Sequence, residues 1–237
     1  MIDTRITRKR TPAPPSDPTD GDLRQILAAS RGVLDENRAD PRLCLVMGPP
    51  GHGAAPPLFW GRHESTFGPV LAAATATGLC WLSFIRDLAG PSEAEALSLT
   101  DLTAAWPHSR LIHQPAATSD AIALAFIHET RLAAPLPVQL QGSEFQLKVW
   151  SALLRIPTGA LVSYGDLAKA IGRPTAFRAT GSAVGANPVS VLVPCHRVIG
   201  VSGSVYKYSG GPERKKALLA WELQHRFPHS PSTSAMP

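Results

Sequence analysis

Glycine and proline recur along this chain and mark where many of its helices and strands are expected to end. Proline disrupts the interior of helices and sheets, and glycine favours turns. The chain has 23 prolines and 19 glycines among its 237 residues. Even its most apolar stretch, residues 67–85, contains Pro69 and Gly78. A strand, a turn and a second strand therefore fit this stretch better than a membrane-spanning helix.

The length and composition predict a globular protein of one or two domains. With 44% hydrophobic residues, a chain of this length can bury a substantial core. Its first residues lead into charged and proline-rich sequence and lack the apolar core of a secretory signal. We therefore expect a soluble, cytoplasmic protein.

The two ends of the chain differ in character from the rest. Residues 1–59 carry a basic cluster and many prolines, and we expect them to form a disordered extension. Within this extension, residues 22–37 could hold one helix, with Leu23 and Ile26 on its apolar face. We also expect a flexible tail over residues 227–237.

Short apolar runs alternate with helical patterns over residues 60–137, which predicts a small α/β subdomain. Pro135 and Pro137 then mark a break, after which residues 138–226 show mainly helices ended by glycine or proline. The expected fold is therefore an α/β N-terminal subdomain followed by a mainly α C-terminal domain with short strands at the active site. The strands expected in the first subdomain are residues 70–74, 79–85 and 111–113, and its helices are residues 92–105 and 119–131.

Two short helices in the C-terminal domain suggest a helix-turn-helix. Ser163 and Asp166 have the spacing that caps a helix N-terminus, and Gly172 ends that helix. A second helix is expected from about residue 175 to residue 186, after an Arg-Pro turn. Before both of them, the apolar stripe of residues 145–154 predicts a helix that faces the core.

Positive charge is concentrated in the same C-terminal domain. Residues 143–226 contain eleven lysines and arginines against four acidic residues, whereas the rest of the chain contains twelve against fourteen. Such a basic surface suits a polyanion such as DNA, although a solvated basic face fits the count equally well.

The chain has three cysteines, Cys44, Cys80 and Cys195, which are too few for a disulfide framework and are not spaced for a metal site. Cys44 and Cys80 stand in apolar runs, where we expect buried structural thiols. Each of the three cysteines should be a free thiol.

Cys195 stands in a different setting from the other two. A short strand, expected over residues 189–193, leads into Pro194, and the polar His196 and Arg197 follow the cysteine. An apolar core would not need those groups, so the thiol is a candidate nucleophile. A free cysteine is mostly protonated at neutral pH and needs a basic partner, and His196 could be that partner.

The Pro-Cys-His-Arg-Val sequence at residues 194–198 is the signature of the O6-alkylguanine-DNA alkyltransferases, also called methylated-DNA–protein-cysteine methyltransferases, and this segment resembles their catalytic domain. The resemblance is strong over residues 145–222, weaker over residues 65–82 and absent over residues 1–59. Supporting motifs stand in the family's order: Val162-Ser-Tyr164, Arg173-Pro174, Arg178-Ala179, Gly185-Ala-Asn187-Pro188, Tyr208-Ser-Gly-Gly211, Arg214-Lys215 and Leu218-Leu219 with Glu222.

This resemblance implies a DNA repair enzyme that acts once. Cys195 would accept an alkyl group irreversibly from O6-methylguanine in double-stranded DNA, with O4-methylthymine as a second candidate substrate. The base would be flipped out of the duplex, because a protein nucleophile cannot reach the alkyl carbon inside the stack. The resemblance also implies a monomer with no membrane partner, no metal and no cofactor.

The catalytic roles of the family fall on four residues of this chain. Glu222 would act through a water on His196, which would remove the proton from Cys195. Tyr164 resembles the tyrosine that contacts the extruded guanine and helps to protonate the leaving base. From residue type alone, Glu222 fits a solvated helix residue better than a catalytic group, and Tyr164 also fits a half-buried tyrosine of the first helical turn.

The second helix of the expected helix-turn-helix would lie against DNA. Arg178 resembles the arginine that fills the space left by the extruded base, and a phosphate contact is the alternative. Asn187 resembles the asparagine that joins this helix to the active-site strand, and a helix cap is the alternative. Phe177 departs from the small residue usual beside the arginine. The expected DNA-binding residues are Arg178, Ala179, Thr180, Ser182 and Asn187.

The resemblance also predicts the walls of the alkylguanine pocket, which are Val198, Val205, Tyr206, Tyr208 and Ser209. Tyr206 stands where relatives have glycine or another small residue. If its side chain points inward, it would narrow the pocket and disfavour bulky alkyl groups. If it points outward, it would stack near DNA, cover the site or face solvent.

Two other functions compete with alkyl transfer. A sensor or regulator would bind alkylated DNA without transfer, although relatives of that kind replace the cysteine that this chain keeps. A cysteine hydrolase would need an oxyanion site, of which the sequence gives no separate sign. Incubation with methylated DNA separates the three, since they give stoichiometric transfer, binding alone or turnover.

Overall fold

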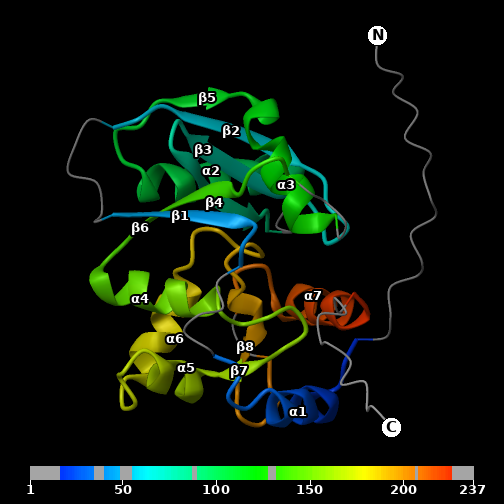
Figure 1. Cartoon of the computed structure of the whole chain (residues 1–237). Coiled ribbons are helices and arrows are strands. Elements are labelled where there is room, and N and C mark those ends of the chain that lie inside the picture. The colour runs from blue at the N-terminus through cyan, green and yellow to red at the C-terminus, as the bar shows by residue number, and fades with distance from the viewer. Residues whose placement is uncertain are drawn as a thin grey trace, which may run out of the picture.

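The structure of the chain, a computed structural model, places a six-stranded sheet in one half of the molecule and a group of helices in the other (Figure 1). It describes residues 17–34, 40–48, 55–86, 90–127, 132–205 and 208–225. The elements are α1 (Asp20–Ala29), β1 (Leu43–Gly48), β2 (Leu58–His63), β3 (Val70–Thr75), β4 (Gly78–Phe84), α2 (Pro91–Ala105), β5 (Leu111–His113), η1 (Pro115–Thr118), α3 (Ser119–Phe126), β6 (Leu136–Gln141), α4 (Glu144–Leu153), β7 (Val162–Ser163), α5 (Tyr164–Ala170), α6 (Phe177–Gly185), η2 (Cys195–Arg197), β8 (Val198–Ile199) and α7 (Pro212–Gln224).

The sheet is mixed and has the strand order β1-β6-β4-β3-β2-β5. Strands β2, β3 and β4 form an antiparallel meander, while β1 and β5 pair in parallel at the two edges. Every residue of β3 is buried, because α2 covers one face of the sheet while α3 and the helical half pack on the other. The strand-turn-strand predicted over residues 67–85 is confirmed as β3 and β4.

One apolar core joins the sheet to the helical half of the molecule. Leu82 of the sheet shares a buried cluster with Trp150 of α4 and with Cys195. The Trp150 indole donates to the carbonyl oxygen of Ala183 at 2.8 Å, which fixes α4 against α6. A subdomain boundary predicted at residue 137 falls inside β6, so the two predicted parts share a strand as well as a core.

Two segments of the predicted disordered extension belong to the fold, so that prediction is wrong for them. β1 pairs with β6 along all six of its residues. α1 begins at a capping box formed by Thr19 and Asp22. The partners of both segments come much later in the chain, which is why local composition suggested disorder. Residues 1–16, 35–39, 49–54 and 226–237 lie outside the described part, and so do the predictions that fall on them.

α1 lies against β7, β8 and α7 (Figure 1). Its Leu23 is fully buried in one apolar cluster with Leu161, Ile199 and Leu219. The guanidinium of Arg24 donates to the carbonyl oxygen of Ser202 at 3.1 and 2.9 Å. A helix from the start of the chain therefore supports three elements that flank Cys195.

The helices expected in the C-terminal domain are present as α4, α5 and α6. The hydroxyl of Ser163 accepts from the backbone of Asp166 at 3.0 Å and caps α5, as the spacing predicted. Gly172 follows α5 with a φ of 72°, a conformation that favours glycine. Other helices are shorter than predicted, since α1 ends at Ala29 and the backbone at Ile127 is extended after α3.

None of the helices in the described ranges is both long and apolar enough to cross a membrane. The longest, α2, has 15 residues. The most apolar stretch, residues 67–85, likewise contains the strands β3 and β4 and not a membrane-spanning helix.

Candidate active site

The segment before Cys195 is a turn and not the predicted strand over residues 189–193. Only Val189 makes a bridge, to Leu82 of β4. Val191 has a φ of 70°, which is uncommon for a β-branched residue and takes the backbone out of the extended conformation. Backbone strain of this kind persists only where the surrounding contacts hold it in place.

The side chain of Asn187 supplies such contacts. Its amide nitrogen donates to the carbonyl oxygen of Val193 at 2.8 Å, and its amide oxygen accepts from the backbone nitrogen of Val189 at 3.1 Å. Asn187 thus connects the end of α6 to the turn that leads into Cys195.

Cys195 begins the short helix η2, and its side chain is buried in the apolar core. Burial raises the pKa of this thiol, although Asn187 and the positive charge of Lys215 act in the opposite direction. The group is therefore a thiol at neutral pH and needs a base before it can act as a nucleophile.

Glu222 lies buried on α7, where Arg197 holds it as a carboxylate. Burial acts to raise the pKa of Glu222, but the charge of Arg197 and the hydrogen bonds from His196 and Arg197 outweigh it and keep the pKa well below its usual value. Arg197 donates from Nε to Oε2 at 2.9 Å and from Nη2 to Oε1 at 2.7 Å. Its guanidinium also donates to the hydroxyl of Thr158 at 3.1 Å. The pair is a buried, hydrogen-bonded ion pair of fixed geometry.

His196 is fully buried, and its Nε2 lies 2.8 Å from Oε1 of Glu222. A carboxylate can only accept, so Nε2 carries the proton and Nδ1 keeps its lone pair. Burial lowers the pKa of His196, so the imidazole is neutral. The predicted water between Glu222 and His196 is wrong, because the two side chains are in direct contact. Nδ1 has no hydrogen-bond partner within the described part and is free to accept a proton.

Lys215 is a site residue to which sequence reasoning gave no role. It is buried on α7 and donates from Nζ to the carbonyl oxygen of Val198 at 2.6 Å. Burial lowers its pKa to about 8, while the proximity of Cys195 acts to raise it. Its spacing from Leu218 and Glu222 on one face of α7 was the available signal, because it puts a lysine and a glutamate on an apolar stripe.

A cavity of about 610 Å³ opens beside Cys195, between α5, α6 and the segment around Tyr208. This volume lies within the range of small-molecule sites, and it is large enough for a purine base. Lys215 and the unassigned Phe177 also line it. The predicted site residues that it brings together are Tyr164, Arg178, Ser182, Asn187, Cys195, Tyr208 and Ser209.

Two residues predicted to face DNA or the pocket point elsewhere. Thr180 is fully buried, which contradicts its predicted place on the DNA-contacting face, since that position of α6 faces the core. Val205 packs against the α1 cluster and does not line the cavity. Ala179 is exposed on α6 but lies outside the cavity wall.

Val198 and Tyr206 complete the predicted pocket. The side chain of Val198 is fully buried, and its carbonyl oxygen is taken by Lys215. Tyr206 lies outside the described residues, as does Lys207 beside it. The effect of Tyr206 on the pocket therefore stays a prediction.

The exposure of the other two cysteines was predicted with mixed success. Cys80 is buried, as predicted, and its burial raises the pKa of the thiol to about 12. Cys44 is exposed, which contradicts the prediction, because it lies on the edge strand β1. Neither thiol lines the cavity beside Cys195.

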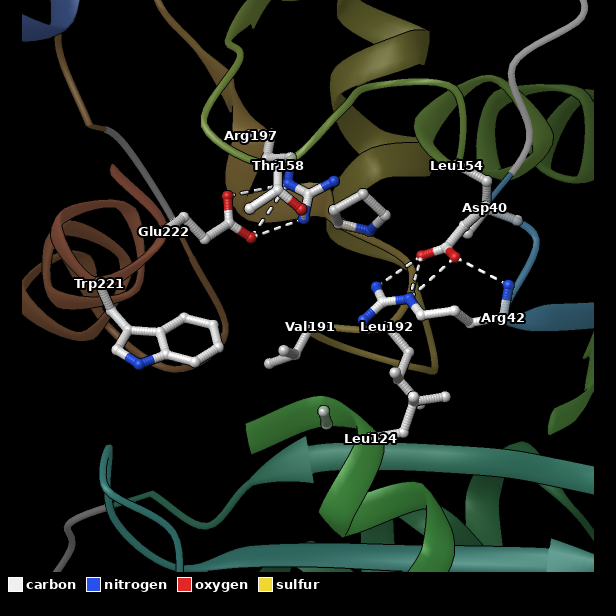
Figure 2. A pocket seen from close by; sticks show the side chains of 12 residues that line it. Asp40, Arg42, Leu124, Leu154, Thr158, Val191, Leu192, Arg197, Trp221 and Glu222 are labelled. Atoms are coloured by element: carbon white, nitrogen blue, oxygen red, sulfur yellow. Dashed lines mark hydrogen bonds and ion pairs between the residues drawn. The ribbon is translucent and has the colours of Figure 1, made fainter. Parts of the chain in front are cut away.

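A smaller cavity of about 40 Å³ lies beside the ion pair of Arg197 and Glu222 (Figure 2). A second ion pair, between Asp40 and Arg42 at 2.7 Å, faces it from the opposite wall. This volume holds only one or a few waters, so it is no site for a base.

Known proteins resemble the segment that carries this site. Residues 144–224 match the family described as 6-O-methylguanine DNA methyltransferase, DNA binding domain. The methylated-DNA–protein-cysteine methyltransferase of Mycolicibacterium paratuberculosis is 53% identical over 90 residues, which are 38% of this chain and 54% of that protein. The match spans about half the length of that protein and of other curated relatives of the same kind.

Solved structures extend the similarity beyond this segment. The O6-methylguanine methyltransferase of Mycobacterium tuberculosis has a TM-score of 0.56 and 35% identity, and the match covers 74% of this chain and 96% of that one. A structure of Mycobacterium tuberculosis OGT in complex with DNA has the same TM-score of 0.56 at 35% identity, over 70% of this chain and 94% of that one. Because the matches include the Cys195 segment and nearly the whole length of these solved relatives, the chain belongs to the O6-methylguanine DNA methyltransferase family.

Proposed function

We propose that this chain repairs DNA by accepting the methyl group of O6-methylguanine on Cys195, once per molecule. The observation that carries the proposal is the arrangement around the thiol. Cys195 lines the large cavity, and the next residue, His196, is a neutral base that Glu222 and Arg197 hold in one tautomer. The relative solved in complex with DNA supports DNA as the partner.

The chemistry balances with the groups at this site. Nδ1 of His196 takes the proton of the Cys195 thiol, directly or through a water, and Glu222 stabilises the imidazolium that forms. The thiolate attacks the methyl carbon, so that a C–S bond forms while the bond from that carbon to O6 of guanine breaks. The electron pair stays on the guanine, which takes a proton from Tyr164 or water. The thioether is inert to these groups, so each molecule acts once.

The stoichiometry of transfer tests this function. Native protein is incubated with an excess of duplex DNA that carries O6-methylguanine with a radiolabelled methyl group, and the label on protein is followed with time. We expect it to reach one methyl group per chain and stop. Binding without label on the protein would show a sensor, and release of label beyond one equivalent would show a hydrolase.

The substrate range and setting belong to the same proposal. O4-methylthymine is the second candidate substrate, since its methyl group is also carried on a ring oxygen and the base could be extruded in the same way. We further propose that the protein acts as a monomer in the cytoplasm, with its own side chains and without a metal or a cofactor. Competition between the two methylated duplexes for one equivalent of protein measures the preference.

Lys215 places a positive charge near the Cys195 thiol, and the lysine keeps this charge below a pH of about 8. Lys215→Met should therefore raise the pKa of that thiol and slow transfer at neutral pH by about tenfold, which corresponds to about one pKa unit. The loss should shrink as the pH rises. Transfer rates across the pH range measure this, with Lys216→Met on the same helix as the control. An unchanged pH profile in Lys215→Met would show that Lys215 serves only the fold.

Arg178, exposed near the start of α6, is proposed to fill the space left by the flipped base. Arg178→Ala should slow transfer from duplex DNA at least about tenfold, because extrusion costs a few kcal/mol. Transfer from the free base O6-benzylguanine should stay near the native rate, since no duplex is opened. Arg173→Ala, in the turn before α6, controls for loss of general charge. An equal loss on duplex and free base would place Arg178 in the pocket or the fold instead.

A further inference from the structure

We propose that Phe177 is an aromatic wedge that enters the duplex beside Arg178 and stacks on the base pair next to the extruded nucleotide. The inference rests on the proposed function, because it concerns how the same site holds its duplex. It assigns a role to the residue that the sequence marked as a departure from the family.

The Phe177 side chain is left in solvent by the fold. It is 51% exposed at the first residue of α6, and of the six large hydrophobic side chains exposed in the described part it is the only aromatic one. Single exposed apolar residues are common on proteins, so exposure alone assigns no role. The position of Phe177 beside the Cys195 cavity indicates a role for the exposed side chain.

Phe177 stands at the cavity that contains Cys195. It lines that cavity together with Tyr164 and Arg178, and the guanidinium carbon of Arg178 lies 5.9 Å from the centre of the phenyl ring. A base held in this cavity would therefore lie in a space that this ring helps to enclose. The ring also gives the arginine an apolar surface against which to rest.

The rest of the exposed face of α6 carries little bulk. Ala179, Ser182 and Gly185 are exposed along it, and Gly181 is half-buried between them. Such a face lets the helix backbone approach a groove closely. Phe177 is then the one large apolar side chain that projects from the approaching face, next to the one arginine of α6.

An apolar side chain in this position has a known physical effect on a duplex. Phenylalanine and leucine inserted from the minor groove partly unstack a base step and open it. Stacking between an aromatic ring and a base tolerates any sequence, because every base presents a π-face. Phe177 would thus stabilise the opened step while Arg178 occupies the gap, and it would slow the return of the extruded base into the stack.

The test compares Phe177→Ala and Phe177→Trp with the native protein and with Leu97→Ala, which removes an exposed apolar side chain on α2. We expect Phe177→Ala to lower the rate of methyl transfer from limiting duplex DNA by about tenfold, as loss of one stacking contact predicts. Phe177→Trp should restore most of the rate. The same variants are assayed with free O6-benzylguanine, for which no base step is opened. We expect the loss caused by Phe177→Ala to be several times larger on duplex DNA than on this free base.

A fluorescent base reports the stacking directly. 2-Aminopurine is placed in the duplex next to O6-methylguanine and read with Cys195→Ala protein, so that binding is seen without transfer. We expect the 2-aminopurine fluorescence to be lower with the Cys195→Ala protein than with the double variant that also carries Phe177→Ala, because the phenyl ring stacks on the reporter base.

The outcomes separate this inference from the function on which it rests. Native duplex rates in Phe177→Ala, equal losses on duplex and free base, or an unchanged 2-aminopurine signal would each overturn the wedge. Disappearance of the Phe177→Ala effect in an Arg178→Ala background would do so too, since the ring would then act only by orienting the arginine. If the native protein itself transferred no methyl group to Cys195, the proposed function would fail instead.

Discussion

Replacement of Cys195 by alanine is expected to abolish methyl transfer while the variant still binds methylated duplex DNA. The described wall of the large cavity contains one sulfur, that of Cys195, whereas the proposed DNA contacts come from Arg178 and the exposed face of α6. Mass spectrometry of peptides after exposure to methylated DNA measures the result. The native protein should gain one methyl group on the Cys195 peptide, and the variant should gain none.

The two other cysteines are internal controls for this prediction. Cys44 is an exposed thiol, and Cys80 is a buried thiol whose pKa is raised to about 12. Neither lines the cavity, so neither should be methylated in the native protein, and Cys44→Ala should react at the native rate. A methyl group on Cys44 or Cys80 would contradict the assignment of Cys195 as the methyl acceptor. It would mean that a thiol outside the cavity can accept the methyl group.

Replacement of Glu222 by alanine is expected to cost about 3–5 kcal/mol of stability, because it leaves the buried charge of Arg197 without a partner. The same change frees Nε2 of His196, so the tautomer with a basic Nδ1 is no longer held. We expect the transfer rate to fall at least about a hundredfold. Urea unfolding and single-turnover transfer measure the two effects. Glu222→Gln keeps the shape of the side chain but removes its charge, so it separates the loss of charge from the loss of the side chain.

The pH dependence of stability gives an independent check on Glu222. Its pKa is lowered in the folded chain, so its contribution is present above the unfolded value of 4.5 and is lost as the pH falls toward the folded pKa. The stability gap between native protein and Glu222→Ala should therefore narrow in acid. Glu213→Ala, an exposed glutamate of the same helix, should show little loss at any pH. A gap that does not change with pH would mean that Glu222 stabilises through packing alone.

Local signals in the sequence predicted local structure. Ser163 with Asp166 marked the start of α5, and Gly172 marked its end, because capping and a left-handed turn depend on a few adjacent residues. β1 was missed, and the helix expected over residues 22–37, which is present as α1, was assigned to a disordered extension, because both segments are stabilised by distant partners. The hydroxyl of Ser30, at the end of α1, accepts from the backbone of Leu161, 131 residues later, and no local pattern shows such a contact.

The candidate site was predicted unevenly for the same reason. The signature motif located Cys195 and His196, but the direct contact of His196 with Glu222 depends on how α7 packs. Thr180 was placed on the wrong face of α6, although its spacing from the buried Ala183 and Val184 indicates the core side of a helix. The family resemblance gave Thr180 its DNA-binding role, whereas helical periodicity indicates which face of α6 its side chain lies on.

The support that α1 gives to the C-terminal elements has a consequence during synthesis. A ribosome adds roughly 5–20 residues per second, so Leu219 emerges about 10–40 s after Leu23, whose apolar cluster it completes. For that interval the apolar face of α1 is exposed to chaperones and proteases. A chain that stops before α7 can never cover this face. The first helix in the described part of the chain is thus among the last to have its apolar face covered.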